Sequence, residues 1–263
     1  MCQGMDMADK LVHYTTATGV ATITLDSPHN RNALSAALRA QFAANLERAI
    51  DDDTVRVIVL DHTGPVFCAG MDLKEAKGAN AGQQGVNDFP ALLQQLWTSP
   101  KPVIAKLAGP ARAGGVGLVA ATDIAVAVEE ATFAFTEVRI GVVPAVISVT
   151  VLPRIDARAA HELFLTGETF DARRAAEIGL LNAAVPADKL DSTVERYVRS
   201  LSLGAPTALA ATKELLQGET ARTMPEVFKK MQALSAQFFA GKEGQEGIAA
   251  FAEKRSPNWV PRT

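Results

Sequence analysis

The sequence has few of the residues that disulfide-stabilised proteins and thiolate metal sites need. Only two of its 263 residues are cysteine, Cys2 and Cys68, and they lie far apart in the chain. One distant pair forms neither a disulfide framework nor a cluster of metal ligands. Because free thiols suit a reducing compartment, we expect a cytoplasmic protein.

The sequence also lacks a large excess of either positive or negative charge. The 26 Lys and Arg residues nearly balance 29 Asp and Glu residues, the net charge is -3, and no basic run stands out. Since nucleic-acid-binding proteins carry a basic patch or stripe, no nucleic-acid partner is expected. The longest mostly apolar run, Gly141 to Pro153, is too short for a membrane helix. Met1 to Lys10 lacks the apolar segment of a signal peptide, so no membrane partner is expected either.

Several catalytic motifs are missing as well. The chain contains no P-loop, no G-x-S-x-G turn and no G-x-G-x-x-G dinucleotide fingerprint. Its four histidines lie at no metal-ligand spacing from one another or from a cysteine; they are His13, His29, His62 and His161. We therefore expect neither a bound metal ion nor a separate cofactor.

The composition is that of an ordinary globular protein, with 48% hydrophobic and 21% charged residues. Short apolar runs typical of buried strands alternate with helical patterns, which predicts an α/β fold. The expected strands are Leu11–Thr16, Gly19–Leu25, Val55–Leu60, Val103–Leu107, Ile124–Val128 and Thr132–Phe135. Helices are expected after Ser35 as N-cap, over Asp88–Trp97 and after the glycine-rich turn at 113–117.

The second half of the sequence is expected to be almost wholly helical from Ala157 onward. Helix starts are expected at Asp171, Asp191 and Pro206. One apolar helix face is expected to consist of Val227, Met231, Leu234 and Phe238. We therefore predict an α/β core over residues 1–200 and a helical C-terminal region over residues 201–263. Gly78–Gly85 is expected to be a surface loop.

Two loops of small residues follow buried strands and are the first candidates for a functional site. They are Phe67–Leu73 and Ala113–Gly115, and the second loop opens a helix. Backbone N–H groups at a helix N-terminus are unpaired and electropositive. Two such loops facing each other would give two donors to one oxygen, which is an oxyanion hole. The alternative is that the glycines only permit tight turns or close packing.

Glu137 is the third candidate because apolar residues flank it on both sides. A carboxyl group in such surroundings has a raised pKa, which suits it to proton transfer near neutral pH. The alternative is a structural ion pair with Arg139, which would share a face with Glu137 if the preceding strand continued.

Taken together and in this order, several segments resemble the enoyl-CoA hydratase/isomerase family, the crotonase superfamily. The resemblance covers nearly the full chain and implies a spiral of ββα units packed against C-terminal helices. The segments that carry it are Arg31–Ser35, Phe67–Leu73, Gly109–Gly115, Thr122–Ile124, Glu137–Gly141 before Pro144, and Glu246–Arg255.

The resemblance also implies an acyl-CoA thioester as the substrate, with coenzyme A as part of that substrate. It implies that the backbone amides of Met71 and Gly114 hold the thioester oxygen. It assigns contacts with CoA, some of them often across a subunit boundary, to His29, Asn30, Arg31, Ala69, Leu73, Phe251 and Lys254. It further implies a homotrimer or a dimer of trimers, in which the C-terminal region covers CoA and joins subunits.

One position departs from the family pattern. Two-carboxylate hydratases of this family carry a glutamate three residues after the second oxyanion glycine, and here that residue is Gly117. Glu137 is then the only matched catalytic carboxylate. We expect a lyase that adds water to a 2-enoyl-CoA thioester. An enoyl-CoA isomerase, for which one carboxylate suffices, and a non-catalytic acyl-CoA-binding protein are the alternatives.

Overall fold

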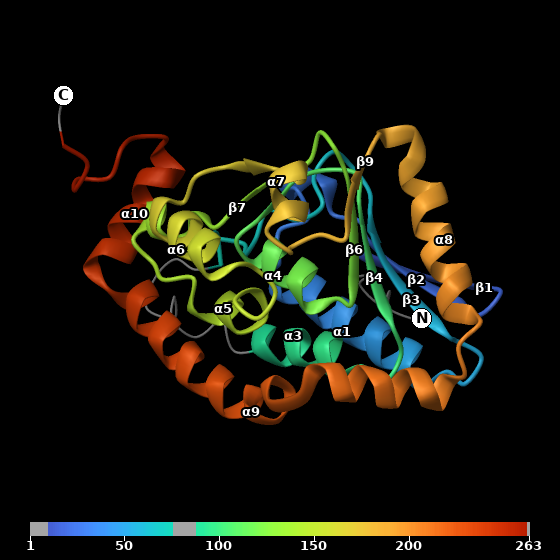
Figure 1. The fold of residues 1–263 in the computed structure, drawn as a ribbon. Helices are drawn as coiled ribbons and strands as arrows, with labels where there is room; N and C mark the ends of the chain where they lie inside the picture. The colour runs from blue at the N-terminus through green and yellow to red at the C-terminus, as the bar shows by residue number, and fades with distance from the viewer. Residues whose placement is uncertain (1–9, 76–87, 262–263) are drawn as a thin grey trace, which may run out of the picture.

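The computed structural model describes residues 10–75 and 88–261 (Figure 1). The expected surface loop over Gly78–Gly85 lies outside these ranges. A six-stranded sheet runs through the molecule in the order β1-β2-β3-β4-β6-β9. Helix α1 covers one face of the sheet and α8 covers the other. The α/β expectation is confirmed, and α9 and α10 make up most of residues 201–263.

The strands of the main sheet are β1 (Val12–Ala17), β2 (Val20–Leu25), β3 (Val57–His62), β4 (Val103–Leu107), β6 (Ile124–Val128) and β9 (Ala183–Val185). A smaller sheet contains β5 (Ala111–Arg112), β7 (Thr132–Ala134) and β8 (Phe170–Asp171). The helices are α1 (Ala36–Asp51), α3 (Phe89–Thr98), α4 (Gly114–Ala121), α5 (Ala145–Val151), α6 (Ala157–Thr166), α7 (Ala172–Glu177), α8 (Leu190–Ser202), α9 (Pro206–Ala240) and α10 (Lys242–Glu253). Short 3-10 helices are η1 (Pro28–Asn30), η2 (Thr136–Ile140) and η3 (Ala187–Lys189).

The first two expected strands are confirmed, and together they form a β-hairpin. β1 and β2 pair antiparallel, and the two turn residues Thr18 and Gly19 have φ of 50° and 79°. Two consecutive positive φ values give a turn whose twist matches that of the flanking strands. From β2 onward the main sheet is parallel, so each next strand needs a crossover, and the helices supply it.

Helix α1 begins where the sequence predicts. The Ser35 side chain accepts a hydrogen bond from the Leu38 amide at 3.2 Å, which caps the helix. Leu38, Phe42 and Leu46 follow at four-residue spacing, and all three are fully buried. This apolar face packs against β1 and β2, so the first ββα segment is specified by local sequence signals.

The expectation that the chain is almost wholly helical after Ala157 misses two short strands. Two-residue β8 pairs with β7, and β9 pairs in parallel with β6 at the edge of the main sheet. β9 is only Ala-Ala-Val, which has no alternating pattern and no preference strong enough to mark a strand. Its backbone becomes a strand because β6 offers it unpaired hydrogen-bonding groups.

The expected buried face of the C-terminal helix is also displaced. Val227, Met231, Leu234 and Phe238 are only half-buried. After Gly218 the buried residues of α9 are Met224, Phe228, Ser235 and Phe239, and the last three each directly follow a residue of the expected face. Both faces carry large apolar residues, so periodicity alone does not decide between them. A break at Gly218, with φ 44° and ψ -126°, sets the direction in which the second half of α9 runs.

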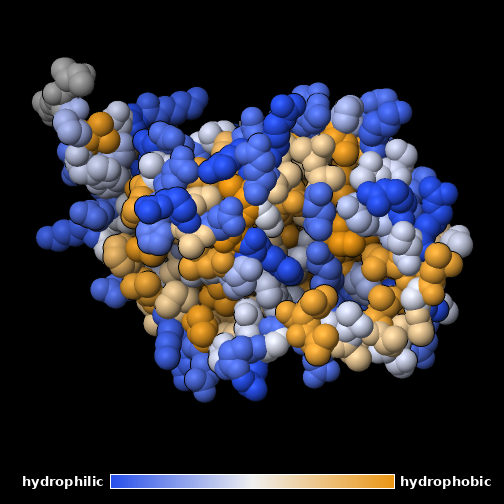
Figure 2. Space-filling view, in the orientation of Figure 1, coloured by the Kyte–Doolittle hydropathy of each residue, from blue (hydrophilic) through white to orange (hydrophobic). Residues whose placement is uncertain are grey.

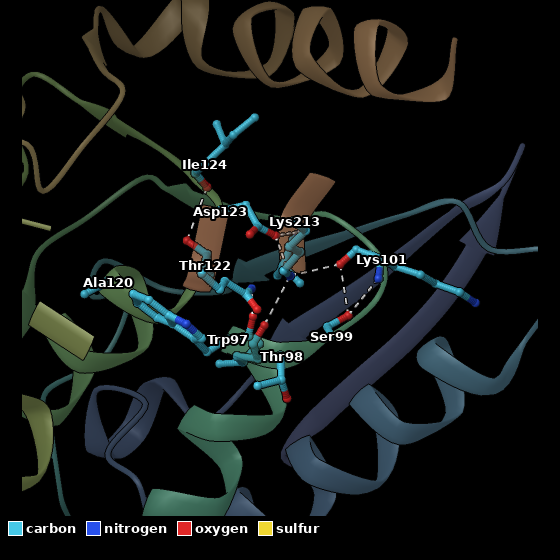
Figure 3. Close-up of polar contacts among 12 residues, drawn as sticks. Trp97, Thr98, Ser99, Lys101, Ala120, Thr122, Asp123, Ile124 and Lys213 are labelled. Atoms are coloured by element: carbon cyan, nitrogen blue, oxygen red, sulfur yellow. Dashed lines mark hydrogen bonds and ion pairs between the residues drawn. The ribbon is translucent and has the colours of Figure 1, made fainter. Parts of the chain in front are cut away.

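Helix α9 is tied to the sheet by a buried ion pair (Figure 3). The Lys213 Nζ atom lies 2.7 Å from Asp123 Oδ2 and also donates to the Lys101 carbonyl at 3.2 Å. The same Asp123 oxygen accepts a hydrogen bond at 2.8 Å from the amide of Val103, the first residue of β4. Arg154 stacks over Trp97 beside this cluster, with its guanidinium 4.3 Å from the ring centroid. Asp123 thus connects α9 to the N-terminal end of β4 through its carboxylate.

We expect Lys213→Ala to lower the free energy of unfolding by about 3 to 5 kcal/mol. The change leaves the Asp123 carboxylate largely buried without its cation, which is the costly way to break a buried pair. Urea denaturation followed by circular dichroism measures the effect. Lys229→Ala, on an exposed position of the same helix, is the matched control and should change the value by less than about 0.5 kcal/mol. If both variants lowered the free energy of unfolding equally, the Lys213–Asp123 ion pair would not be what ties α9 to the sheet.

Apolar side chains also reach the surface along α9, at the lower edge of the molecule in Figure 2. Leu215 and Leu216 are 79% and 81% exposed. Such residues are compatible with contacts between subunits, and the homotrimer or dimer of trimers stays a prediction. Within the described ranges, no helix has both the length and the apolar character needed to cross a bilayer.

Candidate active site

A cavity of about 370 Å³ lies between the two small-residue loops, η2, α5 and the C-terminal helices. It brings together seven of the residues expected at the site: Arg31, Ala69, Met71, Leu73, Gly114, Glu137 and Phe251. The other four expected residues do not line it, and they are His29, Asn30, Gly117 and Lys254. Phe251 reaches the cavity of its own chain, whereas Lys254 is exposed at the end of α10.

The two loops lie against each other because glycine permits a very close approach. The Arg112 amide donates to the Cys68 carbonyl at 3.0 Å. A Cβ atom on Gly115 would lie 2.5 Å from that same carbonyl oxygen, so no larger residue fits. A Cβ on Gly70, which has φ 89°, would lie 3.4 Å from the Gly114 nitrogen. Close packing is therefore confirmed for these glycines, and it is what places Met71 beside Gly114.

The backbone amides of Met71 and Gly114 are both available to a ligand. Neither donates a backbone hydrogen bond within the part of the chain that the structure describes. Gly114 is the first residue of α4, where amides have no partner inside the helix and the helix dipole is positive. The preceding Ala113 has φ 47° and ψ -117°, a conformation that costs free energy for a residue with a side chain. Such strain is typical of loops held in place for function.

Glu137 lies on η2 and not on a continued strand. The expected alternative, an ion pair with Arg139, is wrong: Arg139 Nε donates to the Thr166 carbonyl at 2.7 Å. The Glu137 Oε2 atom is buried and has no hydrogen-bond partner among the described residues. Burial raises the pKa of Glu137 to about 7, so the carboxyl group can both accept and release a proton near neutral pH.

Gly117 is packed against α5 and does not face the cavity. A Cβ on Gly117 would lie 2.6 Å from Ile147 Cγ2. The Thr150 hydroxyl donates to the Gly117 carbonyl at 3.1 Å and holds the two helices together. Ile147 lines the cavity, so an apolar side chain occupies the region into which a side chain at position 117 would extend.

A family model described as enoyl-CoA hydratase/isomerase matches residues 15–262. The chain belongs to this family. A crystal structure of an enoyl-CoA hydratase from Mycobacterium avium is 45% identical, with a TM-score of 0.86 over 96% of this chain and 100% of that one. Carnitinyl-CoA dehydratase of Proteus mirabilis (strain HI4320) is 33% identical over 259 residues, which is 95% of this chain and 98% of that protein.

The fold is therefore that of the crotonase superfamily, as the resemblance predicts, and the family acts on acyl-CoA thioesters. Its structural relatives extend beyond hydratases. A methylmalonyl-CoA decarboxylase in complex with 2-nitronate-propionyl-CoA is 25% identical, with a TM-score of 0.81 over 97% of this chain and 100% of that one. The family acts on acyl-CoA thioesters, but proteins of this fold catalyse more than one reaction. The residues of the cavity must therefore decide which reaction is proposed here.

The turn at Arg31 and Asn32 places Arg31 in the lining of the cavity. Both residues have positive φ, 60° and 52°. The buried Asn32 side chain accepts from the Ser27 amide at 2.7 Å and donates to the Val66 carbonyl at 2.8 Å. The Ala69 amide in turn donates to the Arg31 carbonyl at 3.0 Å. Asn32 therefore joins the first turn to the Phe67–Leu73 loop, a positioning role that the sequence alone did not indicate.

Several cavity residues come from elements that no local motif marks. Pro144 to Ile147 arrive at the start of α5, and Ser235 and Phe239 arrive from α9. Their nearest sequence signal was apolar periodicity, which does not distinguish a core residue from a cavity residue. They were missed because only tertiary packing brings α9 over α5.

Proposed function

We propose that this protein is an enoyl-CoA hydratase-like lyase that adds water to the double bond of a 2-enoyl-CoA thioester. The observation that carries the proposal is the state of Glu137. Glu137 lines the same cavity as two available backbone amides. One oxygen of its buried carboxyl group has no partner among the described residues, and the pKa of the group is about 7. Coenzyme A belongs to the substrate, and the proposal needs no separate cofactor.

In the proposed reaction the thioester oxygen accepts hydrogen bonds from the Met71 and Gly114 amides. Negative charge develops on this oxygen as the enolate forms, so the two donors stabilise the transition state more than the substrate. The ionised Glu137 takes a proton from water while the oxygen of that water bonds to the β-carbon. Protonated Glu137 then delivers the proton to the α-carbon. The product contains the elements of one water molecule, and Glu137 returns to its starting state.

Turnover of crotonyl-CoA, together with a structure of the protein bound to a saturated acyl-CoA, tests the proposal. Hydration should be detected, and the thioester oxygen should lie within about 3.1 Å of the Met71 and Gly114 nitrogens. A bound acyl-CoA with its thioester elsewhere would overturn the site assignment. Binding without any turnover would favour the non-catalytic acyl-CoA-binding alternative.

A double-bond isomerase is the second candidate, because Ile147 occupies the region where a second carboxylate would stand. In that reaction Glu137 removes a proton from the α-carbon of a 3-enoyl thioester and returns it to the γ-carbon. No water needs to be held, so one carboxylate suffices.

Restoring a carboxylate at position 117 discriminates between the two candidates. Gly117→Glu alone would collide with Ile147, so the informative variant is Gly117→Glu combined with Ile147→Ala. If the site is a hydratase site, hydration of a 2-enoyl-CoA should exceed that of the uncharged Gly117→Gln, Ile147→Ala control by about tenfold or more. Equal rates in both variants, with a wild-type preference for 3-enoyl substrates, would instead establish the isomerase.

A further inference from the structure

Ser235 is a polar residue in an apolar part of the cavity. It lies on the second half of α9, is 4% exposed and lines the cavity together with Phe239, one helical turn further on. Across from them, α5 contributes Pro144, Val146 and Ile147. Except for this hydroxyl, the side chains that α5 and α9 contribute to the cavity are apolar.

Within the part of the chain that the structure describes, the Ser235 hydroxyl lacks a hydrogen-bond partner. No hydrogen bond of this group occurs among the described residues, although serines on helices commonly bond the carbonyl four residues back. Ser200 and Ser202 on α8 do so, at 3.0 and 2.8 Å. A polar group buried without a partner costs free energy, so one that persists needs an explanation.

The hydroxyl oxygen can be reached from the cavity. The fully enclosed polar side-chain atoms without partners, within the described ranges, are Tyr14 Oη, Trp97 Nε1 and Glu137 Oε2. Ser235 Oγ is not in this group, although its residue is almost completely buried. Its remaining exposed surface therefore faces the cavity, and a molecule inside the cavity can supply the missing hydrogen bond.

We propose that Ser235 is a specificity-determining residue that binds an oxygen substituent on the acyl chain, away from the thioester. The inference rests on the proposed function, because it takes the acyl chain of a CoA thioester to be the molecule in the cavity. The substrate class is then an oxygen-bearing enoyl-CoA, and a purely hydrocarbon acyl chain is a poorer substrate. A hydrocarbon chain would leave the Ser235 hydroxyl without a hydrogen bond. A site with a buried polar group discriminates in this way against substrate analogues that lack the matching polar group.

Matched pairs of substrates test the proposal. Each pair consists of two 2-enoyl-CoA thioesters of equal chain length, one ending in a methyl group and the other in a hydroxymethyl group, over a series of increasing lengths. At the length that fits the cavity, wild type should prefer the hydroxylated member by about tenfold in kcat/KM. Ser235→Ala should lose this preference and gain on the methyl-ended member. The exposed Gln237→Ala on the same helix is the control and should keep the preference.

Calorimetric binding of the corresponding saturated thioesters separates this inference from the proposed reaction. If the protein is no hydratase, turnover fails for every pair, yet wild type should still bind the hydroxylated saturated thioester more tightly and Ser235→Ala should not. If the hydroxyl is satisfied by water alone, the members of each pair bind equally in wild type and in Ser235→Ala. That result would overturn the inference and leave the proposed function standing.

Discussion

Replacing Glu137 by glutamine is expected to lower turnover of an enoyl-CoA substrate by about 100-fold or more. Glutamine has the shape of the carboxyl group but neither accepts nor releases a proton in this pH range. Both candidate reactions begin with proton removal by the Glu137 carboxylate, so both should fail. Affinity for CoA thioesters should remain nearly unchanged, because the amide donors and Arg31 are intact. We therefore expect a turnover assay to show this loss while calorimetry shows nearly wild-type binding of a CoA thioester.

The pH dependence of the wild-type enzyme gives an independent check on the same group. With a pKa of about 7, Glu137 is mostly protonated at pH 6 and mostly ionised at pH 8. Because the ionised form is the base, kcat/KM should fall as pH is lowered through about 7. An unperturbed glutamate would lose activity only near pH 4.5. A fall of kcat/KM near pH 7 rather than near pH 4.5 would therefore indicate that this carboxyl group is buried.

Glu130→Gln is a suitable control, since this glutamate is exposed in the turn between β6 and β7. It should retain wild-type turnover and the same pH profile. A Glu137→Gln variant that keeps more than about a tenth of the wild-type activity would contradict the role of Glu137 as the only side-chain acid and base.

Sequence reasoning succeeded where structure is specified locally. Ser35 and the apolar residues behind it define α1, and short, mostly apolar runs define β4 and β6 to the residue. Glu137 was identified by the apolar residues around it, and burial does raise its pKa. In each case the decisive information lies within a few neighbouring positions.

It failed where long-range packing decides. β9 is a strand only because β6 has a free edge. The orientation of α9 depends on the break at Gly218 and on the ion pair between Lys213 and Asp123. Ser235 illustrates the consequence. In the sequence it is a small polar residue between two apolar faces, and only the seating of α9 against α5 turns its hydroxyl toward a cavity.

Removing the Gly114 amide is expected to have an effect of similar size. Gly114→Pro deletes the N–H donor while leaving every side chain of the cavity in place. Gly114 is the first residue of α4, the helical position at which proline is best tolerated, so the helix itself should persist. Loss of one oxyanion donor typically lowers kcat by about 100- to 1,000-fold, and we expect a loss in this range.

Gly114→Ala is the matched control because it adds a side chain and keeps the amide. Its Cβ would lie 3.1 Å from the end of the Leu34 side chain, a contact that a small rotation relieves. Its turnover should therefore stay much closer to wild type than that of Gly114→Pro. Since proline also restricts Ala113, whose backbone is already strained, thermal unfolding of both variants has to accompany the rates.

The infrared stretching frequency of an isotope-labelled thioester carbonyl, bound to the wild-type enzyme, tests the same amides without any substitution. Two hydrogen bonds from Met71 and Gly114 polarise the carbonyl and lower its frequency relative to the free thioester. If the frequency is unchanged on binding, the two amides do not act on the thioester oxygen, whatever the rates of the variants. If it falls in wild type and in Gly114→Ala, the close approach of the two loops at Gly70 and Gly115 is explained by the donor pair that it creates.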